Sequence, residues 1–117
     1  MSTASKVHLG RIALLEAIRR DGKEWDVIAP RYGVTNPAPP WKSSLVAMCE
    51  CLSVSGTLPT LDRRRAEDEL VNSVYGEVPA PESELLALVH TLLNRGLVGE
   101  GELSSRMRTV RSRLEAV

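Results

Sequence analysis

Three adjacent arginines, at positions 63 to 65, are the residues of this chain whose type and spacing most favour chemistry. Each has an acid four residues later, in the pairs Arg63/Glu67, Arg64/Asp68 and Arg65/Glu69. Such pairs are typical of a salt-bridged helix surface. However, a basic residue before an acidic one stabilises a helix less than the reverse order. The arginines also lie near the helix N-terminus, which favours anions. Because three successive helical residues span about 200° of the circumference, they cannot share one solvent-facing side.

The helical positions of the three arginines predict different environments for them. Arg63 falls near the apolar side of its helix and Arg65 points outward. Arg64 lies at the edge between these two sides, where we expect Asp68 to hold it. An edge arginine held by a carboxylate is a preorganised donor that can reach across an interface.

Two cysteines and two histidines are the other candidates for chemistry. Side chains two apart on a helix point about 200° from each other, so Cys49 and Cys51 cannot both reach one metal ion. Cys49 lies on an apolar stripe and is interpreted as a core residue. His8 and His90 have no nucleophile and orienting acid close in sequence, and we interpret them as surface or helix-packing residues. The residues therefore do not indicate an independent enzyme.

Helical periodicity predicts the elements that position these residues, and no segment alternates as a strand does. The predicted helices cover 7–20, 41–55, 60–74 with Thr60 as N-cap, a segment from Pro81 to a cap at Gly96, and 102–115. The second helix carries the apolar stripe Trp41, Leu45, Met48, Cys49 and Leu52. The last places Leu103, Met107, Val110 and Leu114 on one side.

The segment 22–40 differs from the rest because four prolines exclude a regular helix. A disordered linker is one interpretation. However, Trp25 and Tyr32 are costly to leave in water, and large aromatic residues often anchor interfaces. We therefore expect an extended arm laid on another subunit, with Trp25, Tyr32, Trp41 and Arg63 as interface residues.

Composition restricts the class of protein. The 117 residues suffice for one domain with a modest core, and the 15 basic and 15 acidic residues leave no basic field for nucleic acid or acidic lipid. Two cysteines and no secretory segment predict a cytoplasmic protein. The expected fold is all-α, with about five helices: an N-terminal helix at 1–21, a proline-rich extended arm at 22–40 and a helical domain at 41–117.

The chain from Trp41 onward resembles the N-terminal helical half of the nitrile hydratase β subunit, and more closely the β-type small subunit of thiocyanate hydrolase. The resemblance is carried by Trp41, CECL at 49–52, Gly56, LDRRR at 61–65, Tyr75 in VYGE and RGLVGEGEL at 95–103. The segment VHLGRIALLEAI at 7–18 is also similar to that small subunit.

This resemblance implies that a cobalt(III) or iron(III) ion lies on a partner subunit, in a C-x-x-C-S-C loop with two oxidised cysteines. The chain has no such loop and would bind no metal itself. Arg64 matches the family arginine that hydrogen-bonds the oxidised cysteines, with Arg63 and Arg65 as neighbours that could exchange the role. Tyr75 matches a tyrosine near the substrate pocket. The family's aromatic-rich stretch is replaced by VPAPESELL, which leaves the substrate preference open.

The resemblance implies a three-subunit enzyme, as in toyocamycin-type nitrile hydratase, because the β subunit's SH3-like barrel does not follow here. The chain would cap the metal site of the α-type subunit beside a separate barrel subunit, and the complex would hydrate a small nitrile to an amide. One alternative is the same architecture acting on thiocyanate. A second is a nitrile hydratase activator or metallochaperone, which often carries a pair like Pro40-Trp41 but shows an aromatic-rich segment where this chain has LDRRR. A third is a helical regulator unrelated to hydratases.

Overall fold

The structure is a computed structural model that describes residues 7–21, 24–35 and 38–116. Within these ranges the chain is helical and contains no strand, which confirms the predicted all-α class. The longer helices are α1 (Ala13–Arg20), α3 (Lys42–Val54), α4 (Thr60–Val71), α5 (Glu82–Asn94) and α6 (Glu100–Glu115). Two single-turn elements, α2 (Trp25–Ile28) and η1 (Ala29–Tyr32), lie in the proline-rich arm.

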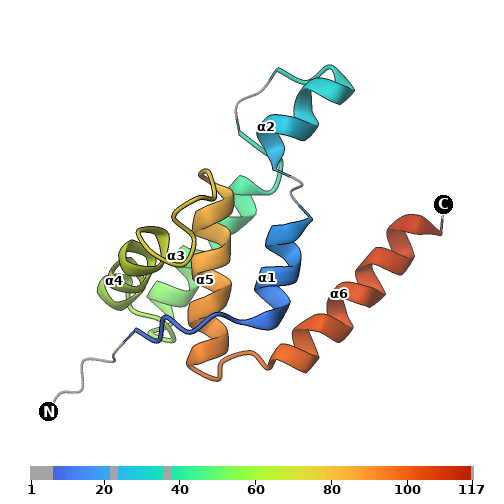
Figure 1. The fold of residues 1–117 in the computed structure, drawn as a ribbon. Helices are drawn as coiled ribbons and strands as arrows, with labels where there is room; N and C mark the ends of the chain where they lie inside the picture. The colour runs from blue at the N-terminus through green and yellow to red at the C-terminus, as the bar shows by residue number, and fades with distance from the viewer. Residues whose placement is uncertain (1–6, 22–23, 36–37, 117) are drawn as a thin grey trace, which may run out of the picture.

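Helix α5 is the centre of the fold, with α3 and α4 on one side and α1 on the other (Figure 1). One core cluster joins α1, α4 and α5 through Leu15, Leu70, Val74, Tyr75, Leu86 and Ala87. A second joins α3 and α5 through Leu45, Leu58, Leu88 and Leu92. Since α5 contributes to both clusters, it needs apolar residues on more than one face, and its sequence ESELLALVHTLLN has them.

The first helix is shorter than predicted. Residues 7–12 are not helical, and α1 begins at Ala13. The reason is tertiary: the backbone carbonyl of His8 accepts hydrogen bonds from His90 Nε2 and Asn94 Nδ2, both at 2.8 Å. These bonds fix residue 8 along α5, so its carbonyl is used there instead of in a local helical turn.

Two other helix starts differ from the prediction by one or two residues. Pro59, not Thr60, is the N-cap of α4, because the proline's extended backbone ends where the helix begins. The hydroxyl of Thr60 is hydrogen-bonded to that of Ser53 in α3. Gly99 caps α6, and its N–H donates to Glu102 Oε1 at 3.3 Å. The helix therefore starts at Glu100 instead of Glu102.

The arm is not uniformly extended, contrary to expectation. The α2 and η1 turns tolerate Pro30 because it stands at the start of η1, where a missing N–H costs no helical hydrogen bond. Gly33, with φ 69°, ends the turn. The backbone N–H of Trp25 donates to Glu82 Oε2 at 2.6 Å, which ties the arm to the first turn of α5. Residues 22–23 and 36–37 of the predicted arm lie outside the described ranges.

The apolar stripe predicted for α3 faces the core, and most of its residues are buried or partly buried. Leu45 belongs to the second core cluster, and Trp41, Cys49 and Leu52 pack against it. Met48 is the exception, with 49% of its surface exposed. At 100° per residue, Met48 lies about 55° from the centre of the other four, which places it at the solvent edge of the stripe.

Candidate functional site

The three arginines of α4 differ in burial. Arg63 is the most buried, with 19% of its side chain exposed, and its Nη1 lies 3.5 Å from Glu67 Oε1. Arg64 and Arg65 are exposed. The predicted pairs Arg64/Asp68 and Arg65/Glu69 do not form: of the three i, i+4 pairs on this described helix, the Arg63–Glu67 pair alone makes contact. Arg64 is therefore not held in advance by Asp68, because both side chains extend into solvent.

A cavity of about 180 Å³ separates α3 from α4 near the Arg63–Glu67 pair. Cys49 and Glu84 also line it. Burial, followed by the Glu84 carboxylate, raises the pKa of Glu67, and the neighbouring Arg63 opposes this rise only in part. Burial also raises the pKa of the Cys49 thiol, so this cysteine is a weaker nucleophile than a free one. Its environment is that of a packed side chain, in agreement with the prediction.

Within the described ranges, no group of three or more His, Cys, Asp or Glu side chains is arranged to hold a metal ion. Cys51 is exposed, whereas Cys49 faces α4 and α5. The prediction that the two thiols diverge on α3 is therefore correct.

A larger groove, of about 1000 Å³, lies between the segment 7–9, α4 and α5. Its charged walls come from Asp62, Arg65, Asp68, Glu69 and Arg95. Arg95 Nη2 lies 3.5 Å from Asp62 Oδ2, so an ion pair joins the end of α5 to the first turn of α4. The groove is thus lined by charges of both signs.

Within the part of the chain that the structure describes, Tyr75 and His90 form a fully buried polar pair, both 0% exposed. Tyr75 OH lies 2.7 Å from His90 Nδ1, and the two rings meet edge to face at a centroid distance of 5.6 Å. On the other side of the imidazole, Nε2 lies 2.8 Å from the His8 carbonyl oxygen. A chain of hydrogen bonds thus runs from Tyr75 through α5 to the N-terminal segment.

These contacts determine which atoms of the neutral His90 ring carry the proton. A carbonyl oxygen can only accept, so His90 Nε2 must donate to His8. In the neutral ring Nδ1 is then the acceptor, and the Tyr75 hydroxyl donates to it. Every polar atom of the pair is used, which is the condition for burying polar side chains at low cost.

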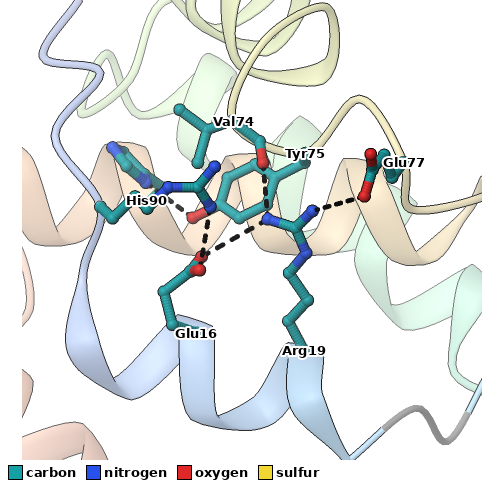
Figure 2. A network of polar contacts seen from close by, with 7 residues as sticks. Glu16, Arg19, Val74, Tyr75, Glu77 and His90 are labelled. Carbon is teal, nitrogen blue, oxygen red and sulfur yellow. Dashed lines mark hydrogen bonds and ion pairs between the residues drawn. The ribbon is translucent and has the colours of Figure 1, made fainter.

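Two charged residues of α1, Glu16 and Arg19, lie on the α1 side of this buried pair (Figure 2). Arg19 Nη1 donates to the Val74 carbonyl oxygen at 2.8 Å and lies 3.6 Å from Glu16 Oε2, while its Nη2 lies 3.6 Å from Glu77 Oε2. Burial and then the Glu16 carboxylate raise the pKa of Tyr75 to about 12. The phenol therefore stays protonated at neutral pH and cannot act as a base there.

The site residues predicted from sequence are not gathered in one place. Tyr75 is enclosed in the core, so its hydroxyl cannot touch a substrate while the bundle is closed. Trp41 packs against the second core cluster, and Trp25 is partly buried beside Pro39 and Pro40. Tyr32, at 78%, is the exposed aromatic residue of the arm.

The Tyr75–His90 pair is the feature that sequence reasoning missed. The two residues lie 15 apart on different elements, and the third partner is a backbone carbonyl 82 residues from His90. The available signal was a histidine on an otherwise apolar helix, which needs a partner for each ring nitrogen when buried.

Comparison with protein-family models, with curated proteins and with solved structures finds no match to this chain. Within the described ranges, no helix is both long and apolar enough to cross a membrane. The functional assignment must therefore come from the residues themselves.

Proposed function

We propose that this chain is the non-metal, β-type subunit of a three-subunit nitrile hydratase, in which it caps a metal site held by a partner. The proposal rests on the motifs that resemble that family, above all LDRRR at 61–65. It also carries the expectation of a cytoplasmic complex with a metal-binding subunit and a barrel subunit.

One observation carries the proposal furthest: Arg64 is exposed on α4 and has no hydrogen bond or ion pair within the described part of the chain. Its two neighbours differ, because Arg63 is committed to Glu67 and Arg65 lies in a groove with acids around it. Of the three arginines, Arg64 thus has the guanidinium most available to another subunit. A site shared between two subunits requires such a side chain, one that makes no ion pair within its own subunit and can bind groups of the other.

The chemistry suits an arginine. Oxidised cysteines carry sulfenate or sulfinate oxygens, and the planar guanidinium can donate two parallel hydrogen bonds to such acceptors. Arg64 would fix the position and charge of these oxygens, which is how groups around a metal's ligands tune the metal. The partner's cobalt(III) or iron(III), when bound, would supply Lewis-acid activation of water or nitrile. Addition of one water to the nitrile carbon–nitrogen triple bond gives the amide.

Tyr75 takes a different place in this proposal from the one its motif suggested. Because it is buried and bonded to His90, it would support the α4–α5 region beneath the capping surface instead of contacting substrate. Exposed apolar residues on α3 and α4 are available to a neighbouring subunit. These are Val46, Met48, Val54 and Leu61.

The test is to reconstitute the chain with a metal-bearing subunit and a barrel subunit, and to compare the nitrile hydration of the wild type with that of the Arg64→Lys variant. We expect the variant to assemble and to lose about 10- to 100-fold in nitrile hydration, because an ammonium cannot reproduce bidentate bonding. Arg65→Lys, at an exposed neighbour that lines the groove of α4 and α5, is the matched control and should retain activity. Unchanged turnover in Arg64→Lys would remove this residue from the site.

The same reconstitution separates the alternatives. Stable recovery of all three chains, with hydrolysis of thiocyanate and no nitrile hydration, would indicate the thiocyanate enzyme. Transient recovery with the metal subunit alone would indicate an activator. A chain that remains monomeric with both partners present would contradict every hydratase assignment.

A further inference from the structure

Helix α6 is the longest helix of the described chain, and it packs weakly against the rest. None of its residues is buried, and its C-terminal end points away from the helices around α5 (Figure 1). One contact that joins it to the rest is at its first turn, where Glu100 Oε2 accepts a hydrogen bond from the Leu14 N–H at 3.2 Å. Most of the stability of a helix in a protein comes from packing of its apolar face, whereas the 16-residue α6 has no buried residue.

Four apolar residues form a continuous seam along α6. They are Leu103, Met107, Val110 and Leu114, at successive spacings of four, three and four residues. This is the a/d pattern of a coiled coil over two heptads. Leu103 is half-buried, and exposure increases along the seam, from 38% at Met107 and 41% at Val110 to 73% at Leu114. The seam is therefore partly covered at Leu103 and becomes more exposed toward the C-terminal end of α6, away from the bundle.

Arginines flank this seam on both sides. At 100° per residue, Arg106 and Arg111 each lie about 70° from the centre of the seam, on opposite sides, and Arg113 lies about 90° from it. These are the g and e positions of the heptads, which choose partners through charge. Arg108 lies about 130° away, on the back of the helix. No acidic residue occurs between Leu103 and Leu114, so the flanks of the seam carry one sign of charge.

The flanking charges argue against a second copy of this chain as the occupant. In an antiparallel pair with matched seams, Arg106 would face Arg113 of the other copy. In a parallel pair, Arg106 would face Arg111. Like charges at these positions destabilise a coiled coil in either orientation. A nucleic acid is also disfavoured, since the strip between the arginines is apolar where phosphates would have to lie.

We propose that α6 is a docking helix for an amphipathic helix of a partner protein, one whose apolar seam is flanked by Asp or Glu. The partner's apolar residues pack between those of α6, and its acids pair with Arg106, Arg111 and Arg113. The seam from Leu103 to Leu114 spans about 16 Å at 1.5 Å per residue, so the interface is short. Charge pairing at its exposed flanks makes the association dependent on salt.

The experiment uses the full chain and two synthetic helical peptides of four heptads. Both have leucine at the a and d positions; one has glutamate and the other lysine at e and g. Binding is measured by fluorescence anisotropy of the labelled peptide. We expect the acidic peptide to bind at least about 10-fold more tightly than the basic one, and added salt to weaken that binding.

Three variants identify the surface, with circular dichroism to verify that each is folded. Val110→Asp should abolish binding of the acidic peptide. The double variant Arg106→Glu/Arg111→Glu should reverse the preference, so that the basic peptide binds more tightly. Arg108→Glu removes the same kind of charge from the back of α6 and should leave the preference unchanged.

Several results would overturn this inference. They are equal binding of the two peptides, an effect of Arg108→Glu as large as that of the double variant, and loss of binding when duplex DNA or RNA competes for the arginines. Self-association of the full chain that Val110→Asp removes would assign the seam to a second copy. The proposed docking does not depend on the hydratase assignment, because it involves neither Arg64 nor a metal subunit.

Discussion

At the scale of single residues, the structure separates side chains that maintain the fold from side chains that are available for recognition. Tyr75 and His90 are enclosed and fully hydrogen-bonded, so they specify how α5 meets α1 and the segment 7–12. Arg64 has the opposite character, being exposed and uncommitted on α4. The type of a polar residue does not show whether it maintains the fold or is available for recognition. Its burial and its hydrogen-bond partners do.

Titration of Tyr75 provides a test of the buried pair. The phenol ionises near pH 10 in the unfolded chain and near pH 12 in the folded one. Between these values the unfolded state binds fewer protons, so the free energy of unfolding falls as pH rises. We expect Tyr75 to account for a loss of about 2–3 kcal/mol between pH 10 and pH 12 and for none at lower pH.

The measurement is urea unfolding of the wild type and of Tyr75→Phe across this pH range. At neutral pH the variant should be less stable by about 1–3 kcal/mol, because Nδ1 of His90 loses its donor. The difference should shrink above pH 10, since groups common to both proteins cancel. Tyr32→Phe, at an exposed tyrosine, should follow the wild type throughout. A constant difference between wild type and Tyr75→Phe would show that the phenol is not shifted.

At the scale of elements, the predictable parts are those whose apolar spacing agrees with their packing. The helices α3, α4 and α5 could be located from periodicity and from the glycines at 56 and 96, which have positive φ. The segment 7–12 could not, because its backbone is held by side chains of α5 more than 80 residues away. The turns α2 and η1 were also missed, since prolines exclude a long helix but not a single turn.

The glycine that ends α5 allows a test at this scale. Gly96 has φ +71°, and a Cβ added there would meet no atom within 4 Å. Gly96→Ala should therefore cost about 1–2 kcal/mol through backbone strain alone. Gly101→Ala is the matched control: it also has free space, but it lies inside α6 and has an ordinary φ. We expect it to be neutral or stabilising by up to about 1 kcal/mol, measured by thermal unfolding. An equal effect at both positions would contradict the role of φ.

At the scale of the whole molecule, the packing that stabilises the fold is distributed unevenly among the helices. The core clusters involve α1, α3, α4 and α5, whereas α6 contributes no buried residue. The candidate site follows the same division: residue type and helical periodicity located the arginine run on α4, but the availability of Arg64 depended on contacts that no local pattern encodes. Asp68 illustrates this, because the i, i+4 spacing permits a bond to Arg64 that the side chains do not form.

Hydrogen exchange of the full chain tests this division. Amides of α5 should exchange only with global opening, and amides of α6 beyond its first turn should exchange much faster, because few tertiary contacts oppose local unfolding. Mass spectrometry of peptides from both helices gives the comparison in one sample. Comparable protection in α5 and α6 would mean that α6 is stabilised by contacts within this chain.

The bonds that His8 accepts from α5 also have a consequence for synthesis on the ribosome. The N-terminal segment is made first, but His90, which donates to His8, follows 82 residues later. At about 5–20 residues per second, the first helix waits roughly 4–16 s for its docking surface to be translated. During this interval the apolar side of α1, including Leu15, has no α5 to pack against. The segment that contains His8 thus reaches its final contacts only after α5 has been translated.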